Sequence, residues 1–184
     1  MHVYWFQDSK IGHLNQVQAL LDELSKENEL AITKIQCPKR SILNWLKSFL
    51  PSAPIENQKD GVTLLIGAGH STYPQILKTQ QTLKKTANLL SVAILKPSFN
   101  ANAFDLICAP EHDYPSTKKP NNVHAFKGSL ATTSLIEPTP NKGIIGLGGS
   151  SKHYEFDDEL VSKQIEYVLT THPHHHFHIY NSRR

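Results

Sequence analysis

Residues 2–16, HVYWFQDSKIGHLNQ, give the clearest indication of the fold. The apolar run HVYWF (2–6) is typical of a buried strand, and DSKIGHLNQ (8–16) follows it as a turn. The turn leads into apolar residues that share one helical face, Leu14, Val17, Leu20, Leu21 and Leu24. Strand, turn and helix in this order predict an α/β protein. The turn also contains an acid, a glycine and a histidine, so it is a candidate ligand loop.

The same alternation continues as far as residue 128. Further short β-branched or aromatic runs predict strands at 31–36, 62–67, 89–95, 104–109 and 122–126. One more helix is predicted from the spacing within 42–50, and another near Ser71, which can cap it. Nearly continuous apolar strands that alternate with helices favour a parallel sheet covered on both faces. We therefore expect residues 1–128 to form a doubly wound α/β domain.

The pattern changes after residue 128. Residues 129–142 lose the alternation and contain two prolines, which is typical of a linker. Residues 143–184 predict the beginning of a second α/β domain, with an apolar strand from Gly143, a helix around 160–169 and a last strand in FHIYNSRR. Units of about 40 residues rarely fold alone. We expect this unit to dock on the first domain, to pair with another chain, or to open a longer domain.

The composition is that of a soluble globular protein. The chain has 184 residues, of which 39% are hydrophobic, and a net charge of +3 from scattered basic residues, which argues against nucleic-acid binding. Cys37 and Cys108 lie in apolar stretches without zinc-ligand spacing, so we expect reduced core thiols. No apolar run reaches the roughly 18 residues of a membrane span, and no signal-peptide pattern is present. These features predict a bacterial cytoplasmic protein, and no spacing calls for a metal or a required cofactor.

The turn after the first strand is the first candidate site. In a doubly wound sheet such a turn faces the ligand crevice, and the next helix directs its free amides there. Gly12 permits close approach, His13 can exchange a proton near neutral pH, and Asp8 can orient the His13 ring. In the alternative reading, Asp8 is a turn former and His13 a solvated residue, and the local pattern alone favours that reading.

Two further glycine-rich loops follow predicted strands. GAGHST (67–72) lacks the third glycine of a dinucleotide fingerprint, and Tyr73 stands where a nucleophile elbow needs glycine. GLGGSS (146–151) offers amides and two hydroxyls suited to a phosphate or carboxylate. Each loop alone is equally consistent with a plain turn, but the three together favour a ligand site.

Two polar segments remain open. If APEHDY (109–114) is extended, Glu111 and Asp113 share one face and His112 lies on the other, so they cannot form a local relay. Capping of a turn by the two carboxylates is at least as well supported. We interpret HPHHHFH (172–178) as a solvated helix-to-strand connection rather than a designed metal site.

Several motifs in combination resemble one known family. They are WFQDSKIGHLNQ, LLIGAG, FDLICAPEHD, NNVHAFKGSLATTS, GLGGSSKHY and SRR, in this order. The combination is similar to the mitochondrial fission protein family of the plant elongated-mitochondria type, whose bacterial members are labelled predicted nucleoside-diphosphate-sugar epimerases. The resemblance implies a GT-B-like protein with two Rossmann-like domains that face a cleft. Relatives continue beyond SRR, so the chain is expected to be truncated before the end of the second domain.

The resemblance also assigns site positions. The motif of the first loop falls on Asp8, Gly12, His13, Asn15 and Gln16. The loop after the third strand falls on Gly67, Ala68 and Gly69, followed by His70, where relatives usually have arginine. The remaining motifs fall on Pro110–Asp113, which includes Glu111 and His112, on Gly148, Gly149 and Ser150, and on Ser182, Arg183 and Arg184.

These positions imply a nucleotide-sugar-dependent glycosyltransferase or an epimerase relative. In that interpretation His13 is a general base on a sugar hydroxyl and Asp8 orients it. The turn at Gly148 and Gly149, together with Arg183, holds the diphosphate of a uridine-diphosphate-sugar-like substrate. The alternatives are a noncatalytic recruitment module with an unknown protein partner, and an inactive truncated copy.

Overall fold

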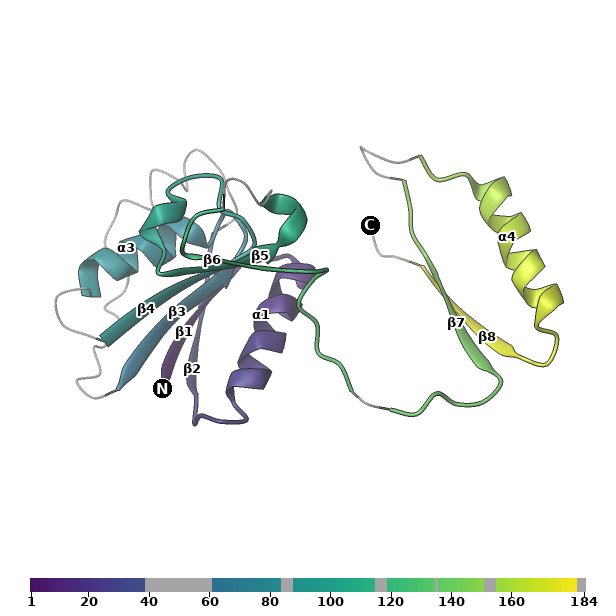
Figure 1. Ribbon diagram of the computed structural model, residues 1–184, viewed down its shortest axis with the longest axis horizontal. Coiled ribbons are helices and arrows are strands. Elements are labelled where there is room, and N and C mark those ends of the chain that lie inside the picture. Colours follow the sequence, from purple (N-terminus) through teal and green to yellow (C-terminus); the bar gives the residue numbers. More distant parts are fainter. Residues whose placement is uncertain (39–60, 84–87, 115–118, 135, 151–154, 182–184) are drawn as a thin grey trace. The chain divides into compact units, whose positions relative to one another are not determined.

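The computed structural model describes residues 1–38, 61–83, 88–114, 119–134, 136–150 and 155–181 (Figure 1). The helix predicted within 42–50 lies outside the described residues, as do Ser182, Arg183 and Arg184. The chain divides into two compact units, Met1–Thr133 and Ser134–Arg184, and each is described by itself.

The first unit contains a six-stranded parallel sheet in the order β2-β1-β3-β4-β5-β6. Its strands are β1 (His2–Gln7), β2 (Ala31–Gln36), β3 (Val62–Ala68), β4 (Asn88–Ile94), β5 (Leu106–Pro110) and β6 (Val123–Phe126). The chain moves outward from β1 to β2 and then returns to place β3 on the other side of β1. This reversal makes the carboxyl ends of β1 and β3 the topological switch point, where ligands bind in open α/β sheets. The predicted doubly wound, Rossmann-like α/β fold is confirmed.

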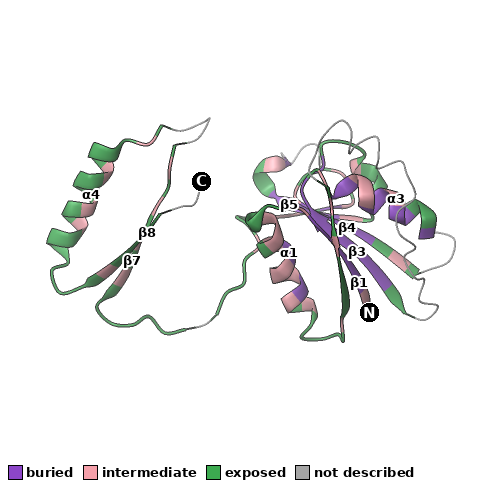
Figure 2. Ribbon diagram, turned by 180° about the vertical axis from the view of Figure 1, so that it is seen from behind, coloured by how far each residue is buried: buried purple, intermediate pink, exposed green. Residues whose placement is uncertain are grey.

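The sheet has a core on both faces, which explains its apolar strands. Figure 2 shows the buried strands between α1 (Ile11–Leu24) and α3 (Tyr73–Leu83). Because successive side chains of a strand point to opposite faces, the buried run of β1 serves two clusters. One cluster contains Val3, Trp5, Val17, Leu21 and Ile66, and the other contains Tyr4, Phe6, Leu65, Tyr73 and Ile76.

Three local details differ from the sequence expectations. Helix α3 begins at Tyr73 rather than near Ser71, and the Thr72 hydroxyl just before it donates to the Gly69 carbonyl at 2.8 Å. Strand β5 begins two residues later than expected, because the chain first forms the 3₁₀ turn η1 (Ala101–Ala103). Glu111–Asp113 is not extended but forms the 3₁₀ turn η2, with His112 Nε2 3.8 Å from Asp113 Oδ1.

A polar network ties α3, β4 and the start of β5 together. Asp105 Oδ2 accepts hydrogen bonds from Ser91 N at 2.8 Å, Ser91 Oγ at 2.7 Å and Gln80 Nε2 at 3.1 Å. Gln80 Nε2 also donates to Ser91 Oγ at 2.9 Å. Since Ser91 and Gln80 are both buried, their donors depend on the Asp105 carboxylate.

The substitution Asp105→Ala is therefore expected to lower the free energy of unfolding by about 2 kcal/mol, because it leaves buried donors without an acceptor. Urea denaturation measures this change. The control is Glu23→Ala, which removes an exposed carboxylate paired with Lys26 and is expected to cost less than about 0.5 kcal/mol. Equal losses in the two variants would show that the network contributes no more than a surface ion pair.

The second unit consists of β7 (Lys142–Leu147), α4 (Asp158–Thr171) and β8 (His176–Asn181), and its two strands are parallel. The Asp157 side chain caps α4 by accepting from Leu160 N at 2.9 Å. Gly143 lies under Phe177, since a Cβ at that position would lie 2.5 Å from Phe177 Cδ1. None of the described residues of this unit is buried, so one helix on two strands does not exclude water from its apolar side chains.

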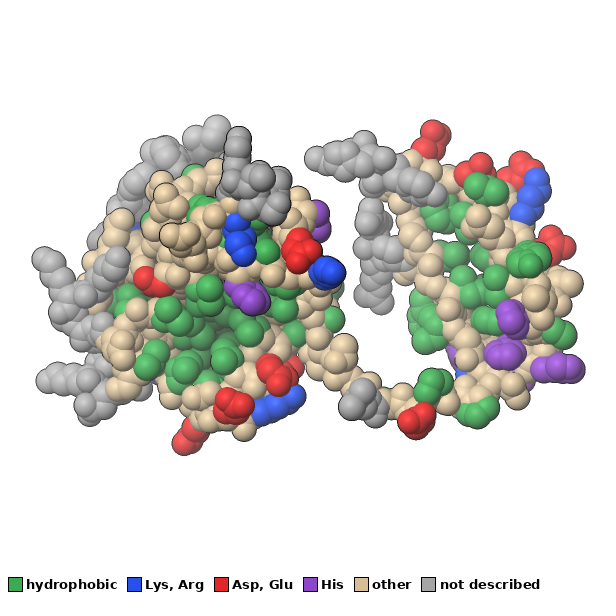
Figure 3. All heavy atoms as spheres, viewed as in Figure 1, with side chains coloured by type: hydrophobic (Ala, Val, Ile, Leu, Met, Phe, Trp, Pro, Cys, Tyr) green, Lys and Arg blue, Asp and Glu red, His purple; other side chains and the backbone are tan. Residues whose placement is uncertain are grey.

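The histidine-rich segment lies on the surface of the second unit. Figure 3 shows histidine side chains gathered where α4 connects to β8, and His172, His174, His175, His176 and His178 are all exposed. Among the described residues, no group of three or more His, Cys, Asp or Glu is arranged to hold a metal ion. Within the same residues, no helix combines the length and apolar character needed to cross a bilayer.

Candidate functional site

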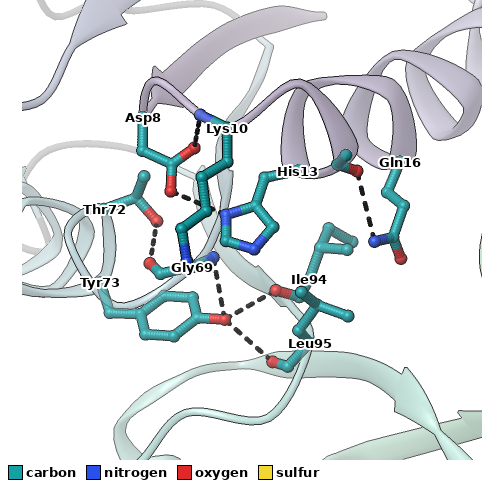
Figure 4. A network of polar contacts seen from close by, with 10 residues as sticks. Asp8, Lys10, His13, Gln16, Gly69, Thr72, Tyr73, Ile94 and Leu95 are labelled. Carbon is teal, nitrogen blue, oxygen red and sulfur yellow. Dashed lines mark hydrogen bonds and ion pairs between the residues drawn. The ribbon is translucent and has the colours of Figure 1, made fainter. Parts of the chain in front are cut away.

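Asp8 and His13 form a hydrogen-bonded pair at the carboxyl end of β1. Asp8 follows the strand, His13 lies in the first turn of α1, and His13 Nδ1 donates to Asp8 Oδ2 at 2.7 Å (Figure 4). The other carboxylate oxygen, Oδ1, accepts from the backbone N–H of Lys10 at 3.0 Å. The side chains are 10% exposed for Asp8 and 18% for His13. The carboxylate is thus held in place from two sides.

This arrangement fixes which nitrogen of the imidazole can act as a base. A carboxylate only accepts hydrogen bonds, so the Asp8 contact keeps the proton of neutral His13 on Nδ1. The lone pair is then on Nε2, which points away from Asp8 (Figure 4). Among the described residues, Nε2 makes no hydrogen bond. The pair therefore has the chemistry of a general base with an orienting carboxylate.

Gly69, in the loop after β3, packs directly against this pair. Its φ is +91°, and a Cβ at this position would lie 2.5 Å from His13 Cε1, 2.8 Å from Asp8 Oδ2 and closer still to His13 Nδ1. Only glycine suits both the backbone conformation and the contact. The loops on the two sides of the switch point therefore meet at Asp8, His13 and Gly69.

Tyr73 holds the Gly69 loop in position. Its hydroxyl accepts from Gly69 N at 3.2 Å and donates to the Ile94 carbonyl at 2.7 Å, with the Leu95 carbonyl at 3.1 Å. Burial raises the pKa of Tyr73, so the hydroxyl keeps its proton. Leu95 has a φ of +72°, a strained conformation for a residue other than glycine. The end of β4 is thereby tied to the loop that contacts His13.

A polar groove of about 460 Å³ lies beside the start of α1, within the first unit. One wall is the helix surface of Gly12, Asn15, Gln16 and Gln18, and the other is the segment Ser129–Thr132. Gln16 Nε2 makes a long hydrogen bond of 3.4 Å to the Gly12 carbonyl, whereas its Oε1 is buried without a partner among the described residues. The groove brings together Gly12, Asn15 and Gln16 of the predicted site.

Cys37 adds a thiol close to Asp8. It follows β2, and its backbone N–H donates to the Gln7 carbonyl at 2.8 Å. Burial, and next the negative charge of Asp8, raise the pKa of the Cys37 thiol to about 12. The thiol is therefore protonated at neutral pH and is a poor nucleophile.

Native Cys37 is expected to react with a disulfide reagent at pH 8 about 100-fold or more slowly than in the urea-unfolded chain, because only the thiolate reacts. Because the pKa of the Cys37 thiol is raised from 9.0 to about 12 on folding, the buried thiol contributes its full stabilisation below pH 9.0. This stabilisation is lost as the pH rises toward about 12, since the unfolded chain loses the proton first. Mass spectrometry after timed labelling distinguishes Cys37 from Cys108. Rapid labelling of Cys37 in the folded protein would contradict the burial argument.

The second-unit candidates follow β7. Gly148 and Gly149 have no heavy atom within 4 Å of a Cβ built on them, so packing does not explain either glycine. Ser150 Oγ accepts from Phe156 N at 3.1 Å and closes this loop. These residues belong to the other compact unit, so their assignment to the same ligand stays a prediction.

The sequence model for mitochondrial fission ELM1 matches residues 11–184. The chain belongs to the mitochondrial fission ELM1 family. The match covers nearly the whole chain and confirms the resemblance found in the motifs. It starts at the first residue of α1 and includes His13, Gly69 and the turn at Gly148. No curated protein and no solved structure matches the chain, so family membership supplies no activity.

Four further predicted positions of this ELM1-family chain, Gly67, His70, Glu111 and His112, have other neighbours. A Cβ at Gly67 would lie 2.9 Å from both Phe6 O and Thr72 Oγ1, so packing between β1 and the loop already explains that glycine. His70 is exposed, with its ring centroid 5.9 Å from that of Tyr73. Glu111 and His112 are exposed on η2, after β5, and two strands separate β5 from β1.

Lys10, in the first loop of this ELM1-family chain, was not singled out from the sequence. Lys10 is the residue before α1; its side chain is exposed and runs beside the His13 ring in the view of Figure 4. The available signal was its place within the quoted loop, between Asp8 and His13.

Proposed function

We propose that this ELM1-family protein is a nucleotide-sugar-dependent glycosyltransferase or an epimerase-like enzyme, in which His13 removes a proton from a sugar hydroxyl. The observation that carries the proposal is the Asp8–His13 pair, with 2.7 Å between Nδ1 and Oδ2, at the switch point of the sheet. A surface histidine needs neither an oriented ring nor a glycine packed against it. Both are properties of a preorganised base.

In the transfer version of this proposal, His13 Nε2 accepts the proton of an acceptor hydroxyl as the oxygen attacks the anomeric carbon. The bond between that carbon and the diphosphate oxygen breaks, and the diphosphate leaves with the bonding electron pair. Asp8 stabilises the imidazolium that forms, as a buried carboxylate does for a catalytic histidine.

The experiment is a panel of uridine-diphosphate sugars incubated with the whole chain. We expect saturable binding together with turnover, which is release of uridine diphosphate to an acceptor or water for a transfer and formation of a second uridine-diphosphate sugar for an epimerisation. Binding without turnover for every sugar in the panel would contradict the proposal.

We propose a noncatalytic binding module as the second candidate, because the second unit exposes large apolar side chains. Ile144 is 76% exposed and Tyr167 is 71% exposed, as expected of a surface that contacts a protein. This version predicts a partner whose affinity falls with Ile144→Ser or Tyr167→Ser and is unchanged by His13→Ala. Loss of partner binding in His13→Ala alone would contradict it.

A further inference from the structure

The groove beside α1 has two walls that are joined to each other. Gln18 Nε2 donates to Asp22 Oδ1 at 2.6 Å, and Thr132 Oγ1 donates to Asp22 Oδ2 at 3.4 Å. Leu130 packs against the core cluster under α1 and anchors the second wall. The groove is therefore formed before any ligand arrives, which lowers the cost of binding.

The groove is uncharged, and amide and hydroxyl side chains share its lining with apolar surface. Its lining residues are Gly12, Asn15, Gln16, Gln18, Ser129, Leu130, Ala131 and Thr132, and none of these side chains is ionisable. Side-chain amides offer donors and acceptors together, and hydroxyls do the same. Gln16 lines the groove, and its Oε1 is buried without a partner among the described residues, so this amide keeps an unused acceptor.

We propose that this groove binds a neutral, hydroxyl-rich ligand, a carbohydrate chain. An anionic ligand would find no cation among the lining side chains. A peptide with apolar anchors would find only Leu130 and Ala131, and Leu130 is already packed on the core. Paired donors and acceptors on amides and hydroxyls match successive sugar hydroxyls.

Gly12 lines the groove and directly precedes His13 in the first turn of α1, so the groove begins one residue along the chain from the Asp8–His13 pair. A carbohydrate bound here is the acceptor of the proposed transfer. That role rests on the proposed function, whereas carbohydrate binding rests on the groove alone.

The test is a titration of the ¹⁵N-labelled whole chain, followed by amide shifts. The probes are maltotetraose, cellotetraose and the neutral tetrasaccharide of N-acetylglucosamine, compared with anionic tetragalacturonate and with tetraglycine. We expect at least one neutral tetrasaccharide to shift the amides of Gly12, Asn15 and Ser129–Thr132 saturably, with a Kd of about 1 mM or below. Tetragalacturonate and tetraglycine are expected to bind at least about tenfold more weakly, a difference of 1.4 kcal/mol.

Two variants test whether the carbohydrate binds in the groove. Gly12→Leu fills the groove without striking the protein, since no heavy atom lies within 4 Å of a Cβ at that position. Gln16→Leu removes the unpartnered amide. Each is expected to weaken binding about tenfold or more, whereas Ile11→Ala, at an exposed neighbour that does not line the groove, leaves it unchanged. Amide spectra report whether each variant is folded.

Absence of saturable shifts with every neutral tetrasaccharide would overturn the inference, as would shifts outside the groove or binding unaffected by Gly12→Leu in a folded variant. Preference for tetraglycine or tetragalacturonate would assign the groove to a different ligand. Carbohydrate binding in the groove without any uridine-diphosphate-sugar turnover would refute the proposed function and leave the groove inference standing. Turnover without carbohydrate binding in the groove would refute the groove inference and leave the proposed function standing.

Discussion

Replacing His13 with alanine is expected to lower uridine-diphosphate-sugar turnover by about 100-fold or more while changing substrate affinity little. The imidazole acts on a proton in the transition state and contributes little to holding the substrate, so kcat falls and KM stays close to its original value. Steady-state release of uridine diphosphate measures both constants.

The matched control for this variant is His124→Ala, which removes an exposed histidine on β6 of the same sheet. It is expected to keep full turnover. Asp8→Asn keeps the size of the side chain but weakens its hydrogen bond to the His13 ring. We therefore expect a loss of turnover between those of the other two variants. Undiminished turnover in His13→Ala, or an equal loss in His124→Ala, would rule out His13 as the base.

Replacing Gly69 with valine is expected to lower the free energy of unfolding by about 3 kcal/mol and to abolish most of the turnover. A β-branched side chain disfavours the φ of +91°, and its Cβ would overlap the His13 ring and the Asp8 carboxylate. The ring must therefore move, which separates the base from its orienting group. Urea denaturation measures the change in the free energy of unfolding. The ¹⁵N resonances of the His13 ring report whether the ring has moved away from Asp8.

Gly128→Val separates backbone strain from contact with the pair. Gly128 also has a positive φ, of +79°, but no heavy atom lies within 4 Å of a Cβ there. The Gly128→Val variant is expected to lose only about 1–2 kcal/mol of unfolding free energy, from backbone strain, and to keep normal His13 resonances. If Gly69→Val left the His13 resonances unchanged, the packing of this loop on the pair would be refuted.

The α/β fold was predictable because the sheet is buried on both faces. Strands such as 2–6 and 62–67 are almost wholly apolar, and the helix after the first strand shows a clear apolar face. The strand order was not predictable from these patterns. It depends on which strands pair, and the placement of β3 beside β1 is decided by contacts between residues far apart in the sequence.

The Asp8–His13 contact was foreseen as one of two readings of the first loop, because the two residues are only five positions apart. Gly69 was expected at the same ligand site, but its direct contact with the pair was not predictable, and Tyr73 and Cys37 were not connected with it. Their proximity follows from the register of β1 with β3 and β2, in which Phe6 pairs with Gly67 and Gln7 with Gln36. The sequence placed Glu111 and His112 at the end of a strand. It did not predict that β3 and β4 lie between that strand, β5, and β1.

We propose that Asp8 holds His13 as a base with its free nitrogen directed at a ligand. The most direct measurement is ¹⁵N NMR of the His13 ring in the whole chain, at a pH at which the imidazole is neutral. We expect the proton on Nδ1, shifted downfield by the bond to Asp8, and an unprotonated Nε2 that changes on addition of a uridine-diphosphate sugar and an acceptor. A proton on Nε2 of the neutral ring would contradict the account, because no base would then face the ligand.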